Sequence, residues 1–97
     1  MACADLRTFL VETYVPRLYL RAGAEISSRY QEAAHELARI GIAIRWLRSY
    51  AAIEDETYIC IVAACDADEV VLLSRRAALA PDHIVQVVRL EAAAACD

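Results

Sequence analysis

The chain switches between two hydrophobic periods, that of a strand and that of a helix. Residues 6–15 alternate weakly between apolar and polar side chains and are rich in β-forming types, which predicts a first strand. Pro16 ends this strand, because proline has no N–H to donate to a sheet ladder. We assign residues 17–24 to a connection in which Gly23 marks a turn.

A helical period follows over residues 28–40. Its apolar face comprises Tyr30, Ala33, Ala34, Leu37 and Gly41. Ser28, with Gln31 three residues later, matches a capping box, in which side chains bind the free N–H groups of the first turn; Ser27 is an equally good cap. Gly41 suits the end of the helix, because glycine readily adopts the left-handed conformation found there.

The middle of the chain predicts a β-hairpin. Residues 43–53 and residues 57–65 are two runs of β-forming side chains. Between them lies the acidic turn Glu54-Asp55-Glu56, which we interpret as a solvated loop. Its carboxylates are also suitable ligands for a hard cation, although such a site would need further carboxylates from elsewhere in the fold.

The last third of the chain predicts a helix and a strand. Asp66 is a good N-cap, and Glu69 in the first turn suits the positive end of the helix dipole. The helix extends to about residue 79, and Pro81 follows it. Residues 83–90 predict a fourth strand, and residues 91–97 form an alanine-rich tail that we expect to be flexible.

The predicted elements follow one another in the order β-α-β-β-α-β. That order is typical of the split βαβ, or ferredoxin-like, arrangement of the α+β class, a four-stranded sheet with both helices on one face. The chain has 97 residues and no linker that would divide it. We therefore expect a single domain over residues 1–97, with its core within residues 6–90.

The second face of such a sheet needs a partner. The chain is 60% hydrophobic, more than a lone small domain requires, which predicts a homodimer. We expect odd-numbered strand positions on the helix side, namely Phe9, Val11, Ile59, Ile61, Ala63, Val85 and Val87. We expect even-numbered positions on the uncovered side, namely Leu10, Glu12, Tyr14, Ile44, Trp46, Arg48, Tyr50, Tyr58, Cys60, Val62, Ile84, Gln86 and Val88. The candidate ligand-binding or dimer-face residues are Glu12, Tyr14, Trp46, Arg48, Tyr50 and Tyr58, because aromatic side chains and Arg favour interfaces.

Charge and hydropathy exclude several classes of partner. The formal net charge is -4 and there is no basic run, so we do not expect nucleic-acid binding. Asp5 and Arg7 interrupt the N-terminal region, so no secretory signal is predicted. The longest apolar run, residues 58–65, is too short to cross a bilayer. We therefore predict a cytoplasmic protein with reduced cysteines and no membrane partner.

Three segments carry a family resemblance. They are Phe9-Leu-Val-Glu-Thr13, Trp46-Leu-Arg-Ser-Tyr50 before the acidic turn, and Tyr58-Ile-Cys-Ile-Val-Ala63 after it. Together they resemble a family of small, mostly bacterial proteins of unknown function that includes an actinomycete nickel-binding protein. The resemblance covers about residues 8–90 of the chain. It implies a ferredoxin-like fold, a homodimer and nickel as a ligand.

The chain departs from that family pattern at two positions. The family carries His where this chain has Arg48, and it usually carries His in the second helix where this chain has Leu73. A guanidinium group stays protonated and does not bind metals, so both departures argue against nickel at these positions. As an alternative, we hypothesise that Glu12 and Arg48 form an ion pair on the uncovered face, in the space that a metal site would occupy.

The remaining histidines and cysteines show no catalytic spacing. His35 and His83 are far apart in the sequence and do not have the spacing of a zinc site. We expect Cys60 to be a buried strand residue. Cys3 and Cys96 lie in the two tails, which come close together if the first and last strands pair. They form either a disulfide or two separate thiols.

No recognised catalytic motif is present. The chain has no glycine-rich phosphate loop, no nucleophile elbow and no C-x-x-C redox motif. We therefore expect a small homodimeric binding protein of unknown ligand. Two alternatives stay open: a transition-metal protein that binds nickel, and a small enzyme of the dimeric α/β-barrel type, such as an isomerase or oxygenase. In the enzyme, Tyr14, Arg48 and Tyr50 would line a pocket between the sheet and its partner.

Overall fold

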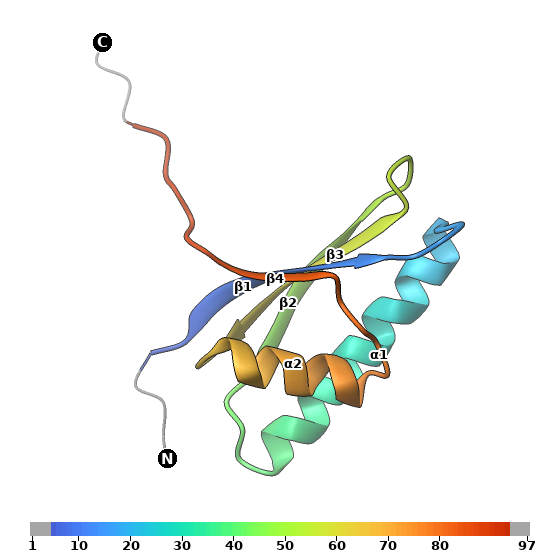
Figure 1. The fold of residues 1–97 in the computed structure, drawn as a ribbon. Coiled ribbons are helices and arrows are strands. Elements are labelled where there is room, and N and C mark those ends of the chain that lie inside the picture. Colours follow the sequence, from blue (N-terminus) through green and yellow to red (C-terminus); the bar gives the residue numbers. More distant parts are fainter. Residues whose placement is uncertain (1–4, 94–97) are drawn as a thin grey trace.

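The structure, a computed structural model, describes residues 5–93. Its elements are β1 (Arg7–Tyr14), α1 (Leu20–Arg39), β2 (Arg45–Ala52), β3 (Thr57–Ala64), α2 (Ala67–Arg76) and β4 (His83–Val87). The strands form one antiparallel sheet in the order β2-β3-β1-β4. Both helices cover the same face of this sheet (Figure 1). The predicted ferredoxin-like α+β fold is therefore confirmed.

The hydrophobic core lies between the sheet and the two helices. The sheet contributes alternate side chains of its two central strands, namely Phe9, Val11, Tyr58, Cys60, Val62 and Ala64. The helices contribute side chains at helical spacing, namely Ile26, Tyr30, Ala33, Ala34, Leu37, Val70, Leu73 and Ala77. The rings of Tyr30 and Tyr58 stack with their centroids 6.0 Å apart, so aromatic packing joins α1 to the centre of the sheet.

The first helix begins earlier than its sequence predicts. It begins at Leu20, so the predicted capping box of Ser28 and Gln31 is wrong: both residues lie inside the helix. Gly23 is likewise a buried residue of the helix and not a turn. The N-cap is Tyr19, whose side chain makes no capping hydrogen bond, so the sequence carries no signal of the kind that marks most helix starts.

The other helix termini follow local sequence. Gly41 has a φ of 90°, as expected after the end of α1. The Asp66 carboxylate accepts a hydrogen bond from the Glu69 N–H at 3.0 Å, which confirms the predicted N-cap of α2. This helix ends at Arg76 rather than at residue 79, and β4 ends at Val87 rather than at residue 90.

The register of the strands corrects the predicted faces. Val11 lies opposite Cys60, and opposite residues of an antiparallel pair share a face, so odd positions of β1 share a face with even positions of β3. In β4, Ile84 lies opposite Val11 and therefore also points to the helix side. The predicted assignment is thus wrong throughout β3 and β4. Both faces of β3 are apolar, so its own hydrophobic pattern does not show which face is covered.

A β-bulge in β2 places Trp46 and Arg48 on opposite faces of the sheet. The register shifts between Trp46, which lies opposite Val62, and Arg48, which lies opposite Ile61. Trp46 therefore packs partly buried against the core, whereas Arg48 lies exposed on the other face. Strict alternation predicted both residues on one face. The bulge adds one residue to the alternation between them, and nothing in the sequence marks its position.

Neither α1 nor α2, the helices of the described residues 5–93, combines the length and the hydrophobicity that a membrane-spanning helix needs.

Candidate functional site

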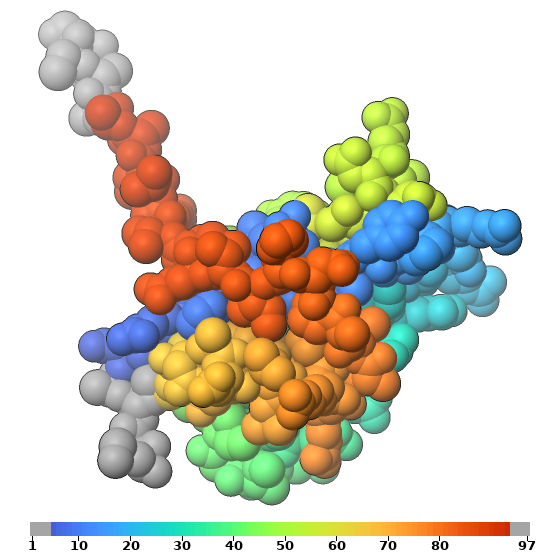
Figure 2. Space-filling view, viewed as in Figure 1, coloured from blue at the N-terminus to red at the C-terminus, as the bar shows by residue number. Residues whose placement is uncertain are grey.

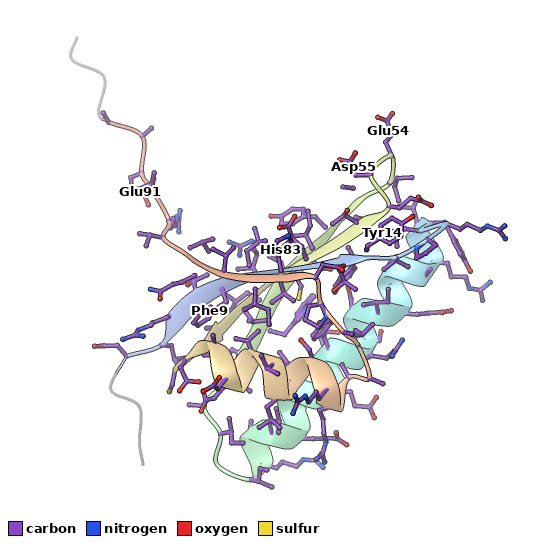
Figure 3. All side chains as sticks on the ribbon, viewed as in Figure 1. Phe9, Tyr14, Glu54, Asp55, His83 and Glu91 are labelled. Carbon is purple, nitrogen blue, oxygen red and sulfur yellow. The ribbon has the colours of Figure 1, made fainter. Side chains whose placement is uncertain are left out.

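The face of the sheet opposite the helices is the candidate functional surface, and we call it the open face. Its members follow from strand register and alternation: Thr8, Leu10, Glu12, Tyr14, Arg45, Arg48, Tyr50, Ala52, Thr57, Ile59, Ile61, Ala63, His83, Val85 and Val87. Figure 3 shows Phe9 on the helix side of the sheet and His83 on the opposite side. No element between residues 5 and 93 covers the open face.

The centre of the open face is apolar. Ile61, Leu10 and Val85 lie side by side in one row across three strands. Val85 is 49% exposed, and Leu10 and Ile61 are partly exposed. Ile59 adjoins this row on one side and Val87 on the other. Contiguous apolar surface of this kind is costly to leave in water, because it loses the free energy that burial would supply.

A polar row borders the apolar centre. Tyr50 lies opposite Ile59, Ile59 lies opposite Glu12, and Glu12 lies opposite His83. Directly opposite side chains in an antiparallel pair have Cβ atoms about 5 Å apart, so the Glu12 carboxylate and the His83 imidazole are neighbours. Tyr50 is 56% exposed at the far end of the row. The row therefore offers a carboxylate, an imidazole and a phenol to anything that contacts this face.

Tyr14 belongs to a separate cluster at one end of the sheet. Its Oη donates a hydrogen bond to Glu56 Oε1 at 3.1 Å, and the Arg17 N–H donates to Glu56 Oε2 at 2.5 Å. The hydrogen bond to Glu56 and the negative charge of this residue raise the pKa of Tyr14. Glu56 thus ties the β2–β3 hairpin to the loop between β1 and α1. Glu54 and Asp55 stand at the hairpin tip (Figure 3), so the three acidic residues do not converge on a common point.

The candidate residues from the sequence divide between the two faces. Glu12, Tyr14, Arg48 and Tyr50 lie on the open face, as predicted. Trp46 and Tyr58 lie on the helix side, and Tyr58 is only 1% exposed, so their assignment to the ligand or dimer face is wrong. The Tyr58 hydroxyl hydrogen-bonds to Ser27 Oγ at 2.9 Å, inside the sandwich.

The hypothesised ion pair between Glu12 and Arg48 does not form within one chain. Glu12 is on β1 and Arg48 is on β2, with β3 between them. Two strand spacings separate the backbones by about 10 Å. Ile59 and Ile61 of β3 occupy the intervening positions on the open face. Glu12 and Arg48 of one chain are therefore not neighbours on this face.

The two positions where the resembling family carries His lie on opposite sides of the sheet. Arg48 is exposed on the open face, and Leu73 is 0% exposed in the core under α2. Their side chains therefore do not fit a shared metal site in this chain. Within residues 5–93, no group of three or more His, Cys, Asp or Glu side chains is arranged to hold a metal ion.

The other candidate groups lie away from the open face or are inert. His35 is exposed on α1. Burial raises the pKa of the Cys60 thiol to about 12, so this thiol stays protonated and is a poor nucleophile. Cys3 and Cys96 lie outside the described residues. The sequence did not predict His83 as a site residue. Its position beside Glu12 depends on the pairing of β1 with β4, which no local motif indicates.

Comparison with known proteins shows a likeness in fold. No family model matches the chain, and no curated protein matches it. Among solved structures, the chain is similar to SCO4226 from Streptomyces coelicolor A3(2), with a TM-score of 0.74 and 13% sequence identity. The alignment covers 87% of this chain and 99% of the other. The chain therefore shares the fold of SCO4226 over nearly the whole length of that protein.

Proposed function

We propose that this chain is a homodimeric binding protein whose two copies stack open face on open face. The observation that carries the proposal is the apolar centre of that face, formed by Leu10, Ile59, Ile61, Val85 and Val87. A second copy is the natural occupant, because a two-fold axis makes the same patch complementary to itself. Burying such a patch is worth about 25 cal/mol for each Å² of apolar area removed from water.

Charge also favours a second copy on this face. Arg48 has no carboxylate beside it in its own row, and Glu12 lies two strands away. In a two-fold dimer, a contact between residue i and residue j occurs twice. The interface therefore brings together two opposite charges, Arg48 of one copy and Glu12 of the other. Such charge complementarity supports specific association.

The ligand of the dimer is proposed to lie beside the polar row. Tyr50, Glu12 and His83 together supply hydrogen-bond donors and an acceptor next to an apolar surface. Small-molecule sites have this composition, a mostly apolar lining with a few polar groups that fix orientation. The residues fit a small, partly apolar molecule that carries a hydrogen-bonding or cationic group.

Sedimentation velocity tests the dimer. We expect the wild-type protein to sediment as a dimer and Leu10→Asp to sediment as a folded monomer, because a carboxylate in the apolar centre would be buried without a partner. Leu72→Asp is the matched control, since Leu72 is 41% exposed on α2 and lies away from the open face. The control should remain dimeric. A monomeric wild type, or a dimer that Leu10→Asp leaves intact, would refute the proposal.

Native mass spectrometry tests the ligand. Protein purified without a chelator should carry an added mass in the dimer, and Tyr50→Ala should lose that mass while remaining dimeric. The binding site would be contradicted if the dimer had the bare mass of two chains after several growth conditions and a thermal-shift screen found no ligand. The protein would then be a dimeric interaction module without a ligand.

A transition-metal ion is the second candidate ligand. The supporting observation is that Glu12 and His83 lie directly opposite each other, a carboxylate beside an imidazole. Both are common ligands of such ions, and a two-fold dimer supplies a second copy of each. Nickel should then raise the melting temperature of the wild type, and His83→Ala should abolish that rise, whereas His35→Ala should keep it. An equal response of all three proteins would exclude this site.

A further inference from the structure

A C-terminal arm, residues 88–93, leaves the body of the molecule after β4. It is outside the sheet, and its two largest apolar side chains are almost bare: Val88 is 74% exposed and Leu90 is 87% exposed. Figure 1 shows the arm departing on the side of the sheet opposite the helices, and Figure 2 shows it projecting beyond the packed body. Arg89 and Glu91 form an ion pair within the arm; both side chains are exposed, so this pair does not attach the arm to the body.

The same end of the molecule carries an apolar hollow. Its volume is about 380 Å³, and it is lined by Leu6, Ala38, Gly41, Ile42, Ala43, Ile44 and Arg45. These residues come from the loop between α1 and β2, the end of α1 and the residue before β1. Arg45 is the charged residue of the lining, and it opens β2 at the edge of the sheet.

Strand register relates the arm of one copy to the hollow of another. Arg45 lies opposite Ala63, Ala63 opposite Thr8, and Thr8 opposite Val87, so one row crosses the sheet from the start of β2 to the end of β4. If two sheets stack about a two-fold axis that runs along the strands, β4 of one copy lies over β2 of the other. Val87, where the arm begins, then lies over Arg45 of the other copy.

The length of the arm matches the distance it must cover. Packed sheets are about 10 Å apart, and six extended residues span about 20 Å. The arm therefore passes the edge of the facing sheet with several residues to spare. Leu90, the third residue of the arm, reaches about 10 Å, which is the level of the facing sheet, where Arg45 both begins β2 and lines the hollow.

We infer that the arm of each copy docks in the hollow of the other, with Leu90 as its apolar anchor. This inference rests on the open-face dimer proposed above and adds the partner segment that completes it. Charge agrees with it, since the arm carries Glu91 and the hollow carries Arg45. The size of the interface also favours an added contact. The flat footprint of the open face is on the order of 450 Å², which is less than the ~800 Å² that each partner buries in a standard interface, so the docked arm would supply part of the difference.

Photo-crosslinking tests the docking directly. The probe is p-benzoylphenylalanine in place of Leu90 in the full chain, with the same probe in place of Leu20 as a control, because Leu20 is 78% exposed on α1. We expect irradiation of the Leu90 probe to give a product of two chain masses. Fragment masses should place the crosslink on the lining of the hollow in the second chain, at Leu6 or within residues 38–45, and the control should not give this product.

The outcomes separate this inference from the dimer itself. A product of one chain mass, or a crosslink to another segment of the partner, overturns the arm contact while the open-face dimer stands. A wild-type protein that sediments as a monomer overturns both. A two-chain product at Leu6 or at residues 38–45 supports both.

Two substitutions give a quantitative measure. Leu90→Ala should raise the dimer dissociation constant about tenfold to hundredfold, the usual range for truncating an anchor side chain. Ala43→Asp should raise it by a similar factor through the other side of the same contact, and the double variant should be no weaker than the stronger single variant. Leu20→Ala is the control and should change nothing. Additive effects in the double variant would contradict a shared contact.

Discussion

At the scale of single residues, hydroxyl groups inside the sandwich connect its layers. Tyr30 Oη and Ser74 Oγ are 3.1 Å apart, joining α1 to α2. Ser27 Oγ lies 2.6 Å from Ser49 Oγ and 2.9 Å from Tyr58 Oη, joining α1 to β2 and β3. The Tyr30–Ser74 pair is buried and the contacts of Ser27 are partly buried, so these bonds help to orient the helices on the sheet.

We predict that Tyr30 and Ser74 are energetically coupled. Tyr30→Phe leaves the Ser74 hydroxyl buried without its partner, and Ser74→Ala does the same to the Tyr30 hydroxyl, so each should lower the free energy of unfolding by about 1–2 kcal/mol. The double variant removes both hydroxyls of this pair, so its loss of unfolding free energy should be smaller than the sum of the two single losses. Urea unfolding of the four proteins at one protein concentration measures this; simple additivity would contradict it.

We predict that stability falls at alkaline pH. Burial raises the pKa of Cys60 from 9.0 to about 12, and that of Tyr30 from 10.0 to about 12. The same cause raises the pKa of Tyr58. The unfolded chain therefore releases these protons first as pH rises, and the stability present below about pH 9 is lost progressively toward pH 12.

The slope of that loss is bounded. Each group contributes at most about 1.4 kcal/mol per pH unit between its unfolded and folded pKa values. Melting temperatures measured from pH 7 to pH 11.5 should show it, and Cys60→Ala should move the onset up toward pH 10, where tyrosine begins to ionise. A wild-type melting temperature that stays constant to pH 11 would contradict the burial of these groups.

At the scale of elements, α1 shows how packing extends a helix beyond its sequence signals. Leu18 is buried just before the helix, and the chain turns there through Arg17, whose φ is 60°. Gly23 sits inside the helix, where its lack of a side chain lowers helix propensity. The helix nevertheless continues through it, because Ile26 and the residues that follow pack on the sheet.

We predict opposite effects of alanine at the two glycines. A Cβ at Gly23 would meet Ala51 Cβ at 3.7 Å and Leu18 Cδ1 at 3.8 Å, ordinary contact distances, so Gly23→Ala should raise the free energy of unfolding by about 0.5–1 kcal/mol. Gly41 has open space around it but a φ of +90°, so Gly41→Ala should lower it by about 1–2 kcal/mol. Urea midpoints of the two variants check both signs. A destabilised Gly23→Ala would mean that the helix does not extend back to Leu20.

At the scale of the whole molecule, the sheet has one covered and one uncovered face, and a second copy is what we propose for the uncovered one. We predict that the melting temperature of the wild type rises with protein concentration, because mass action stabilises a dimer by about 1.4 kcal/mol for each tenfold increase. Leu10→Asp should melt at a temperature that does not depend on concentration. Differential scanning calorimetry over a hundredfold range of protein concentration distinguishes the two proteins. A wild-type melting temperature that does not change with concentration would contradict the dimer.

Local sequence predicted the order of the elements and most of their bounds. The N-cap at Asp66, the glycine after α1 and the alternation in β1 are effects of neighbouring residues on one another, and the structure has all three. The start of α1 escaped prediction because Tyr19 makes no side-chain cap. The start of α1 is therefore set by packing between residues distant in the sequence, and no local sequence signal indicates it.

The candidate site depended on information that the sequence does not carry locally. Sequence alone determined the α+β class, the βαββαβ order and the presence of an apolar face with Glu12 and Arg48 on it, because hydrophobic period and capping act over a few residues. Only the tertiary structure decided that Tyr58 and Trp46 face the core, that His83 stands beside Glu12, and that Arg45 and Val87 share a row. The physical reason is register: a shift of one residue turns every side chain of a strand to the other face, and pairing between strands sets it.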